Sequence, residues 1–233
     1  MQKTTIIAPG GQRYKINLRD GADESVLNEV FKFREYRAAD EIIRNALNPI
    51  IDVGAQAGFF VLYARSLNPT VPILAIEPAR DNVAALGGNL KANSITGVEV
   101  IAGALAARSG QQKLVIAQDN HNHYLATDQV APDAETKLVT VYSLSDILQK
   151  YKVERVSLLK MDIEGGEYEV FSNLSQEDFD SLDNIIMEYH NYNGHNYKEL
   201  ESELREGGFG VQVFPSKFDK QMGFILARNK KIK

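Results

Sequence analysis

A chain of 233 residues is long enough for one large domain with its own buried core and too long for a small disulfide scaffold. Hydrophobic residues make up 44% of it, and its net charge of −5 is the wrong sign for a protein that binds nucleic acid through phosphates. It has no cysteine, hence no disulfide, thiolate zinc site or iron–sulfur cluster. We therefore expect a cytoplasmic protein, and no apolar stretch is long enough to predict a membrane partner.

The pattern of the first 48 residues predicts a segment added to the main fold. A basic, strand-like start leads into an amphipathic stretch, residues 24–47, whose Leu27, Val30 and Ile43 can face a sheet. No repeat or Pro/Ser-rich linker divides the rest of the chain. We predict an N-terminal extension, residues 1–48, packed on one domain, residues 49–233.

Short apolar runs alternate with amphipathic stretches from residue 50 onward. This pattern is typical of an α/β protein in which helices cover both faces of a parallel sheet, a three-layer sandwich. We predict core strands at residues 50–53, 73–76, 98–102, 157–161 and 184–189. We predict helices at residues 59–66, 80–92 and 143–151, with weaker ones at 168–171 and 178–182.

Two further pairs of strands are expected outside this alternation. Residues 113–117 and 138–142 flank a polar loop that could cover a site, and that loop contains His121, His123, Asp128 and Pro132. Residues 210–214 and 222–228 are separated by turn formers, which predicts an antiparallel pair closing the sheet.

Residues 50–60 (IIDVGAQAGFF) form a strand, a glycine-bearing turn and the start of an apolar helix. Gly54 and Gly58 let the main chain bend sharply and approach a ligand closely. A dinucleotide fingerprint needs a second glycine where Gln56 stands, so pyrophosphate is disfavoured. Asp52 suits an ammonium group, such as that of S-adenosylmethionine, and Glu77 ends the next strand where it can accept hydrogen bonds from ribose hydroxyls.

Four segments together resemble the FkbM-type methyltransferases, a class I S-adenosylmethionine-dependent family. They are DVGAQAG at 52–58, AIEP at 75–78, GALA at 103–106 and LLKMDIEGGEY at 158–168. The resemblance implies a Rossmann-like fold, with a seven-stranded, mostly parallel sheet in the order 3-2-1-4-5-7-6 and an antiparallel seventh strand. It also implies methyl transfer to an oxygen, often of a sugar. On the matching positions, the cofactor would lie against Asp52, Gly54, Ala55, Gly58, Glu77, Pro78, Ala104 and Asp162.

A second group of polar residues follows two strands that are neighbours in the family's order. Lys160 and Asp162 alternate at the end of one strand, and Glu188 and His190 at the end of the other, so we expect them to converge. Methylation of a hydroxyl needs a base, for which His190, Asp162 or Glu188 could serve. We favour His190, because its ordinary pKa of about 6.5 is nearest neutrality, and expect Lys160 to pair with a carboxylate.

Three alternatives stay open at this point. Asp162, Glu188 and His190 could bind a divalent ion such as Mg²⁺, Mn²⁺ or Zn²⁺, although we assign no metal site. The same residues could form a structural ion-pair network, and His121, His123 and His195 are taken as solvated loop residues. The chain could also be a nicotinamide-dependent oxidoreductase or a non-catalytic nucleotide-binding module. We predict an O-methyltransferase that uses S-adenosylmethionine on a small-molecule or glycan acceptor, and leave its oligomeric state undetermined.

Overall fold

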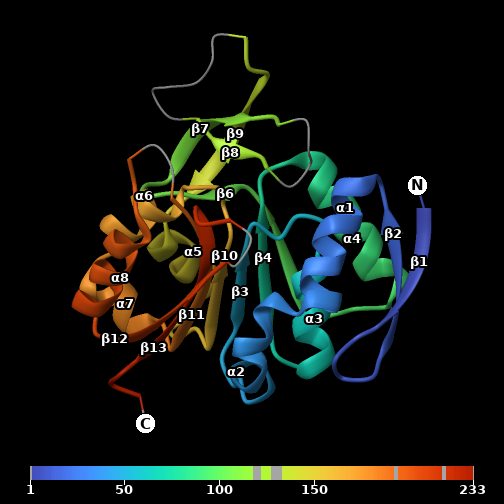
Figure 1. The fold of residues 1–233 in the computed structure, drawn as a ribbon, viewed down its shortest axis with the longest axis horizontal. Helices are drawn as coiled ribbons and strands as arrows, with labels where there is room; N and C mark the ends of the chain where they lie inside the picture. The colour runs from blue at the N-terminus through green and yellow to red at the C-terminus, as the bar shows by residue number, and fades with distance from the viewer. Residues whose placement is uncertain (1, 118–121, 127–132, 192–193, 217–218, 233) are drawn as a thin grey trace.

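The computed structural model describes residues 2–117, 122–126, 133–191, 194–216 and 219–232. Its centre is a seven-stranded sheet in the order β12-β13-β11-β10-β3-β4-β5 (Figure 1). Five strands are parallel neighbours: β3 (Ile50–Val53), β4 (Ile73–Glu77), β5 (Val98–Ala102), β10 (Leu158–Met161) and β11 (Asn184–His190). Strand β13 (Met222–Asn229) runs antiparallel to β11 and to β12 (Phe209–Pro215). In chain order this is the predicted 3-2-1-4-5-7-6 sheet with an antiparallel seventh strand.

Helices cover both faces of the sheet, which confirms the three-layer α/β prediction. Neighbouring strand residues point to opposite faces, so Ile50 joins one hydrophobic core and Ile51 the other. The first core packs against α3 (Phe59–Leu67) and α4 (Arg80–Ala92). The second core packs against α5 (Leu144–Tyr151), α6 (Glu167–Ser172), α7 (Gln176–Ser181) and α8 (Tyr197–Glu206). Figure 1 shows the two groups of helices on opposite sides of the sheet.

The N-terminal segment is a chain of short elements. A hairpin of β1 (Gln2–Ile7) and β2 (Arg13–Leu18) leads to α1 (Gly21–Asn28), a π-helical turn (Glu29–Phe33), a 3₁₀ turn (Glu35–Ala39) and α2 (Asp40–Arg44). The predicted amphipathic stretch is broken at Arg34, whose φ of 54° is left-handed and ends a helix. Leu27, Val30 and Ile43 are nevertheless buried in the core that contains α3.

A second, four-stranded sheet has the order β6-β9-β7-β8 and lies at the top of Figure 1. It contains β6 (Ala104–Leu105), β7 (Gly110–Val115), β8 (Tyr124–Leu125) and β9 (Thr136–Tyr142). The sequence predicted only two of these strands, at 113–117 and 138–142. His121, Asp128 and Pro132 of the intervening loop lie outside the described residues, so the predicted cover over a site stays a prediction.

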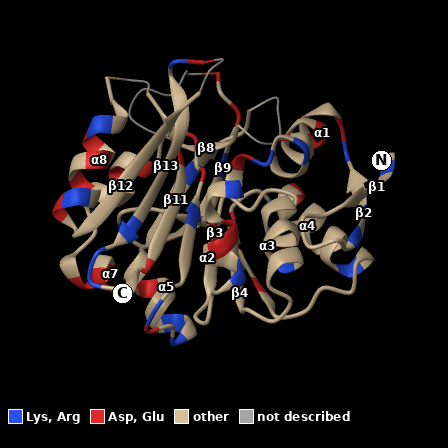
Figure 2. Ribbon diagram, turned by 60° about the horizontal axis from the view of Figure 1, so that its bottom comes forward, with Lys and Arg blue, Asp and Glu red and all other residues tan. Residues whose placement is uncertain are grey.

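Helix α8 is not among the helices that the sequence predicts. Asn196 and Glu199 form a capping box at its start, and Leu200 and Leu204 are buried one turn apart. Figure 2 shows Lys and Arg interspersed with Asp and Glu along this helix. Across the described ranges, we find no helix that combines the length and the apolar character needed to cross a membrane.

Candidate active site

A cavity of about 1040 Å³ opens at the carboxyl ends of the parallel strands. Ligand sites of open α/β sheets lie at this edge, where the strand order reverses. The turn after β3, the ends of β4, β10 and β11, and the first residues of β13 all line it. The N-terminal segment supplies a further wall through Glu29, Glu35 and Tyr36.

The turn between β3 and α3 requires glycine at its first position. Gly54 has a φ of 76°, and a Cβ atom there would lie 1.9 Å from the carbonyl oxygen of Asp162. The amides of Gly54 and Ala55 both donate to the carbonyl of Ile76, at 3.1 Å, which ties the turn to β4. The main chain of the turn is therefore fixed at the cavity wall, and no side chain covers it at Gly54.

Glu77, at the end of β4, is held by three hydrogen-bond donors. Its carboxylate accepts from the amides of Gln56 (2.9 Å) and Ala79 (2.8 Å) and from Nδ2 of Asn82 (3.1 Å). It is 4% exposed and lines the cavity. A buried carboxylate with several donors keeps one orientation, so Glu77 is preorganised to face a ligand.

The N-terminal segment is hydrogen-bonded to this same turn. Nε2 of Gln56 donates to the fully buried Asp23 at 2.8 Å, and Asp23 pairs with Arg19 at 2.6 Å. Arg19 also donates to Oδ1 of Asn82 at 2.7 Å. The links to Gln56 and Asn82 were not predicted, since nothing in the sequence connects residues so far apart.

Asp52 does not line the cavity, which differs from its expected contact with a ligand's ammonium group. Its carboxylate is fully buried and lies 3.1 Å from Nζ of Lys160. Lys160 also donates to the carbonyls of Val53 (3.3 Å) and Gly54 (3.0 Å). Burial opposes protonation of Lys160, but the charges of Asp52 and Asp162 outweigh it and raise the pKa of the amine. The predicted pairing of Lys160 with a carboxylate is thus present. The same amine holds the turn between β3 and α3 through its hydrogen bonds to the two carbonyls.

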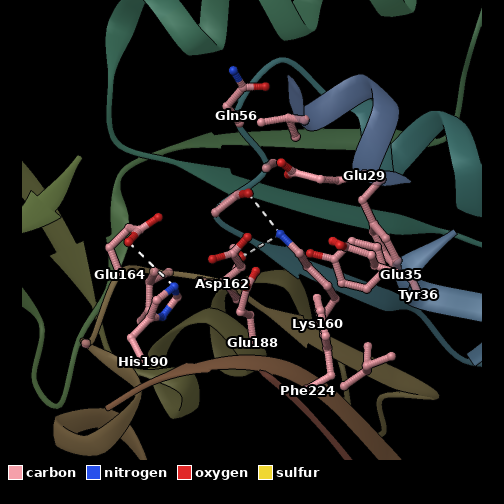
Figure 3. A pocket seen from close by; sticks show the side chains of 18 of the residues that line it. Glu29, Glu35, Tyr36, Gln56, Lys160, Asp162, Glu164, Glu188, His190 and Phe224 are labelled. Atoms are coloured by element: carbon pink, nitrogen blue, oxygen red, sulfur yellow. Dashed lines mark hydrogen bonds and ion pairs between the residues drawn. The ribbon is translucent and has the colours of Figure 1, made fainter. Parts of the chain in front are cut away.

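Asp162, Glu188 and His190 come together as the sequence predicts. One ligand atom of each lies within 4.8 Å of the others. Figure 3 shows the two carboxylates directed toward one another between Lys160 and His190. His190 is 9% exposed, with Nε2 lying 3.6 Å from Glu164 and Nδ1 lying 3.6 Å from Glu167.

The charges of this cluster shift its proton equilibria strongly. Burial, with the charge of Asp162, raises the pKa of Glu188 well above its ordinary value and that of Glu164 to about 7. Burial would lower the pKa of His190, but Glu167, Glu164 and Asp162 together raise it to about 10. His190 is therefore protonated at neutral pH, so the reason for choosing it as the base does not hold in the folded protein.

Most of the predicted site residues border the cavity. Those that line it are Gly54, Ala55, Glu77, Pro78, Ala104, Lys160, Asp162, Glu188 and His190, whereas Asp52 and Gly58 do not. Gly58 instead has a φ of 83° at the start of α3 and packs against Leu86.

The remaining histidines divide between the cavity and the surface. His123 lines the cavity, although it was predicted to be a solvated loop residue. His195 is half exposed, pairs with Glu199 at 2.9 Å and stacks on Tyr168, away from the site.

Comparison with known proteins identifies the family. Residues 52–211 match the model of the methyltransferase FkbM domain. Methyltransferase 1 of Beauveria bassiana is 30% identical over 182 residues, which cover 70% of this chain and 73% of that protein. The 31-O-demethyl-FK506 methyltransferase FkbM of Streptomyces tacrolimicus is 25% identical over 235 residues, 89% of each chain.

Solved structures share the fold at low sequence identity. The METTL16 MTase domain covers 97% of this chain and 86% of its own, with a TM-score of 0.56 and 15% identity. SMU.1697c of Streptococcus mutans, solved in complex with SAH, covers 84% and 97%, with a TM-score of 0.55 and 9% identity. The chain therefore belongs to the FkbM methyltransferase family and is an S-adenosylmethionine-dependent methyltransferase.

Proposed function

We propose that the enzyme transfers the methyl group of S-adenosylmethionine to a hydroxyl oxygen of a small-molecule acceptor, such as a sugar or glycan. The observation that carries this proposal is the pairing of two unlike walls in one cavity. One wall is the glycine turn with Glu77, and the other is the carboxylate edge of Asp162, Glu164 and Glu188. The name of the Streptomyces relative, which specifies an O-demethyl compound, supports oxygen as the acceptor atom.

The residues of the first wall fit the cofactor. At Gly54 the main chain has no room for a Cβ atom on its inner side, and the turn there is open to the cavity at Ala55. The carboxylate of Glu77 retains lone pairs for ribose hydroxyls beside its three existing hydrogen bonds. Pro78 and Ala104 would border the base, and Asp162 the sulfonium end. When bound, S-adenosylmethionine supplies an electrophilic methyl group on a positively charged sulfur.

The residues of the second wall are suited to orient the acceptor and take its proton. In transfer, the hydroxyl oxygen forms a bond to the methyl carbon, the carbon–sulfur bond breaks with its electrons going to sulfur, and the hydroxyl proton leaves. A carboxylate of this edge is a better acceptor for that proton than His190, because the imidazole already carries one at neutral pH. Lys160, tied to Asp52, positions the turn and takes no proton.

The acceptor side of the cavity is aromatic. Tyr36 and Phe60 meet edge to face, with ring centroids 5.0 Å apart, and Phe224 lies 5.5 Å from Tyr36. All three line the cavity together with Phe214. Flat rings beside carboxylates provide stacking surfaces and hydrogen-bond acceptors, which is the combination that a sugar ring with several hydroxyls requires.

The test is formation of S-adenosylhomocysteine from S-adenosylmethionine in a panel of hydroxyl, amine and thiol acceptors. We expect turnover with a hydroxyl acceptor, and a loss of at least about 100-fold in Glu188→Gln, which keeps the shape but not the charge. Binding of NAD in place of S-adenosylmethionine would contradict the proposal, as would turnover confined to amines. Cofactor binding without transfer to any acceptor class would favour a non-catalytic module.

A further inference from the structure

The two adjacent strands β10 and β11 place one donor set at a single point of the cavity. Met161 is in register with Met187, so Asp162 and Glu188 follow side by side at the carboxyl edge. His190 lies two residues further along β11, on the same side of the strand as Glu188. The result is two carboxylate oxygens and one imidazole nitrogen within 4.8 Å of one another.

Carboxylates outnumber cationic side chains at this point among the described residues, although protonated His190 faces Asp162 and Glu188. Carboxylates that line the cavity are Glu29, Glu35, Glu77, Asp162, Glu164, Glu188 and Asp219, and Arg37 and Lys160 line it as well. Lys160 is already engaged by Asp52 and by two carbonyl oxygens. In the described part of the chain, neither Asp162 nor Glu188 has a side-chain hydrogen bond or an ion pair. Carboxylates that are taken out of water are stable only when a cation or several donors face them.

The burial and orientation of the His190 ring are those of a histidine that binds a metal ion. Its ring is nine-tenths buried, and no hydrogen bond reaches Nδ1, which lies 3.6 Å from an oxygen of the fully buried Glu167. That oxygen of Glu167 is itself held at 3.0 Å by the amide of Ile163. A carboxylate behind one ring nitrogen is the usual way in which proteins orient an imidazole whose other nitrogen binds a metal. Figure 3 shows the ring on the same side of the cavity as the two carboxylates.

We propose that Asp162, Glu188 and His190 bind one divalent cation, with Mn²⁺ as the best match to a mixed oxygen and nitrogen donor set. The cation takes the place of the proton that His190 carries in the metal-free protein, and this proton is released to solvent on binding. Three protein ligands leave coordination positions for the acceptor. Given the proposed O-methylation, on which this role rests, a hydroxyl bound to the cation would lose its proton more readily. Glu164, beside the donor set, is placed to receive that proton.

The direct test is titration of the purified, chelator-treated full chain with Mn²⁺, with the free ion followed by electron paramagnetic resonance. The titration is done with saturating S-adenosylhomocysteine. We expect one ion per chain, and at least about a tenfold weaker affinity in both Asp162→Asn and Glu188→Gln. Glu35→Gln removes the same charge from the same cavity but no ligand, so its affinity should change by less than about threefold.

Three outcomes would overturn the proposal. The first is the absence of a saturable Mn²⁺ site in the wild-type protein. The second is an equal loss in Glu35→Gln, which would mean that only the general negative field attracts the ion. The third is competition between Mn²⁺ and S-adenosylmethionine, which would assign the carboxylates to the sulfonium. Circular dichroism of each variant excludes unfolding as the cause of lost binding.

Failure of this proposal is distinguishable from failure of the proposed function. Turnover of a hydroxyl acceptor in excess chelator would overturn the metal site and leave O-methylation in place. A saturable Mn²⁺ site without turnover of any hydroxyl acceptor would support the metal site and contradict O-methylation.

Discussion

The carboxylates of Glu77 and Glu188 lie near the carboxyl ends of two strands of one sheet, yet their surroundings differ. Glu77 accepts three hydrogen bonds from the protein, two of them from main-chain amides. Glu188 lies among other acids, and its pKa is raised well above the ordinary value, first by burial and then by Asp162. The first carboxylate is satisfied before any ligand arrives, whereas the second still needs a cation or a proton. On the proposed function, the cofactor wall, which is the glycine turn with Glu77, is thus preorganised. The reacting edge, formed by Asp162, Glu164 and Glu188, carries unbalanced charge for its ligands to neutralise.

We expect the largest loss of stability from breaking the buried ion pair of Lys160 and Asp52. Lys160→Met leaves Asp52 charged and fully buried beside the acidic edge, which should lower the free energy of unfolding by about 3–5 kcal/mol. Urea denaturation measures this loss. The double variant Asp52→Asn/Lys160→Met, which removes both charges, should recover much of it. A loss below about 1 kcal/mol in the single variant would mean that the pair does not support the site.

The glycine turn offers a matched pair of variants on the cofactor wall. Gly54→Ala places a Cβ atom 1.9 Å from the carbonyl of Asp162, at a φ of 76°, and should cost about 3 kcal/mol of stability. Gly58→Ala has a similar φ of 83°, but its Cβ atom approaches most closely the side-chain Cγ of Leu86, at 3.0 Å. We expect about 1–2 kcal/mol there, so thermal denaturation should rank the two. The reverse ranking would contradict the close approach of β3 and β10.

The unbalanced edge predicts a pH dependence of stability in metal-free protein. Burial raises the pKa of Glu164 to about 7, and burial with the charge of Glu29 raises that of Glu35 to about 7. Between pH 4.5 and 7 the folded state keeps protons that the unfolded state releases. The free energy of unfolding should therefore fall as the pH rises through this window, by about 2 kcal/mol after allowance for solvent screening.

Two variants sharpen this pH test. Glu35→Gln should flatten the fall measured by denaturation between pH 5 and pH 8, because it removes one of the carboxyl groups that keep a proton in the folded state. Glu99→Gln, at an exposed strand position, should leave the slope unchanged. A wild-type stability that rises over this range would contradict the charge imbalance.

We expect the smallest change in stability and in cofactor affinity from a variant at the contact between the N-terminal segment and the glycine turn. Gln56→Ala removes the hydrogen bond to Asp23 and the one that Oε1 of Gln56 accepts from the amide of Ala57, but leaves the pairing of Asp23 with Arg19. It should lower stability by about 1 kcal/mol and raise the Kd for S-adenosylhomocysteine about threefold. The exposed Gln111→Ala serves as control in the same calorimetric titration. An unchanged Kd would show that this contact does not position the turn.

Much of the fold and of the converging edge could be predicted from the sequence. Short buried strands followed by turn residues define a parallel sheet, and its geometry alone brings the carboxyl ends together. That is why Glu77, Asp162 and Glu188 were predicted to face a ligand, and all three line the cavity.

The parts that were missed depend on contacts between distant residues. Lys160 was expected to pair with a carboxylate, but its partner Asp52 was assigned to the ligand instead. The pKa of His190 depends on Glu164 and Glu167, whose side chains reach the ring only through the turn before α6. The wall formed by Glu35 and Tyr36 follows from the break at Arg34, which periodicity does not reveal.

The most direct test of the two unlike walls is calorimetric titration with S-adenosylhomocysteine of the wild type, Glu77→Gln and Glu188→Gln. We expect Glu77→Gln to raise the Kd at least about tenfold and Glu188→Gln to change it by less than about threefold, because only Glu77 belongs to the cofactor wall. Equal losses in the two variants, or a larger loss in Glu188→Gln, would contradict the division of the cavity into a cofactor wall and a reacting edge.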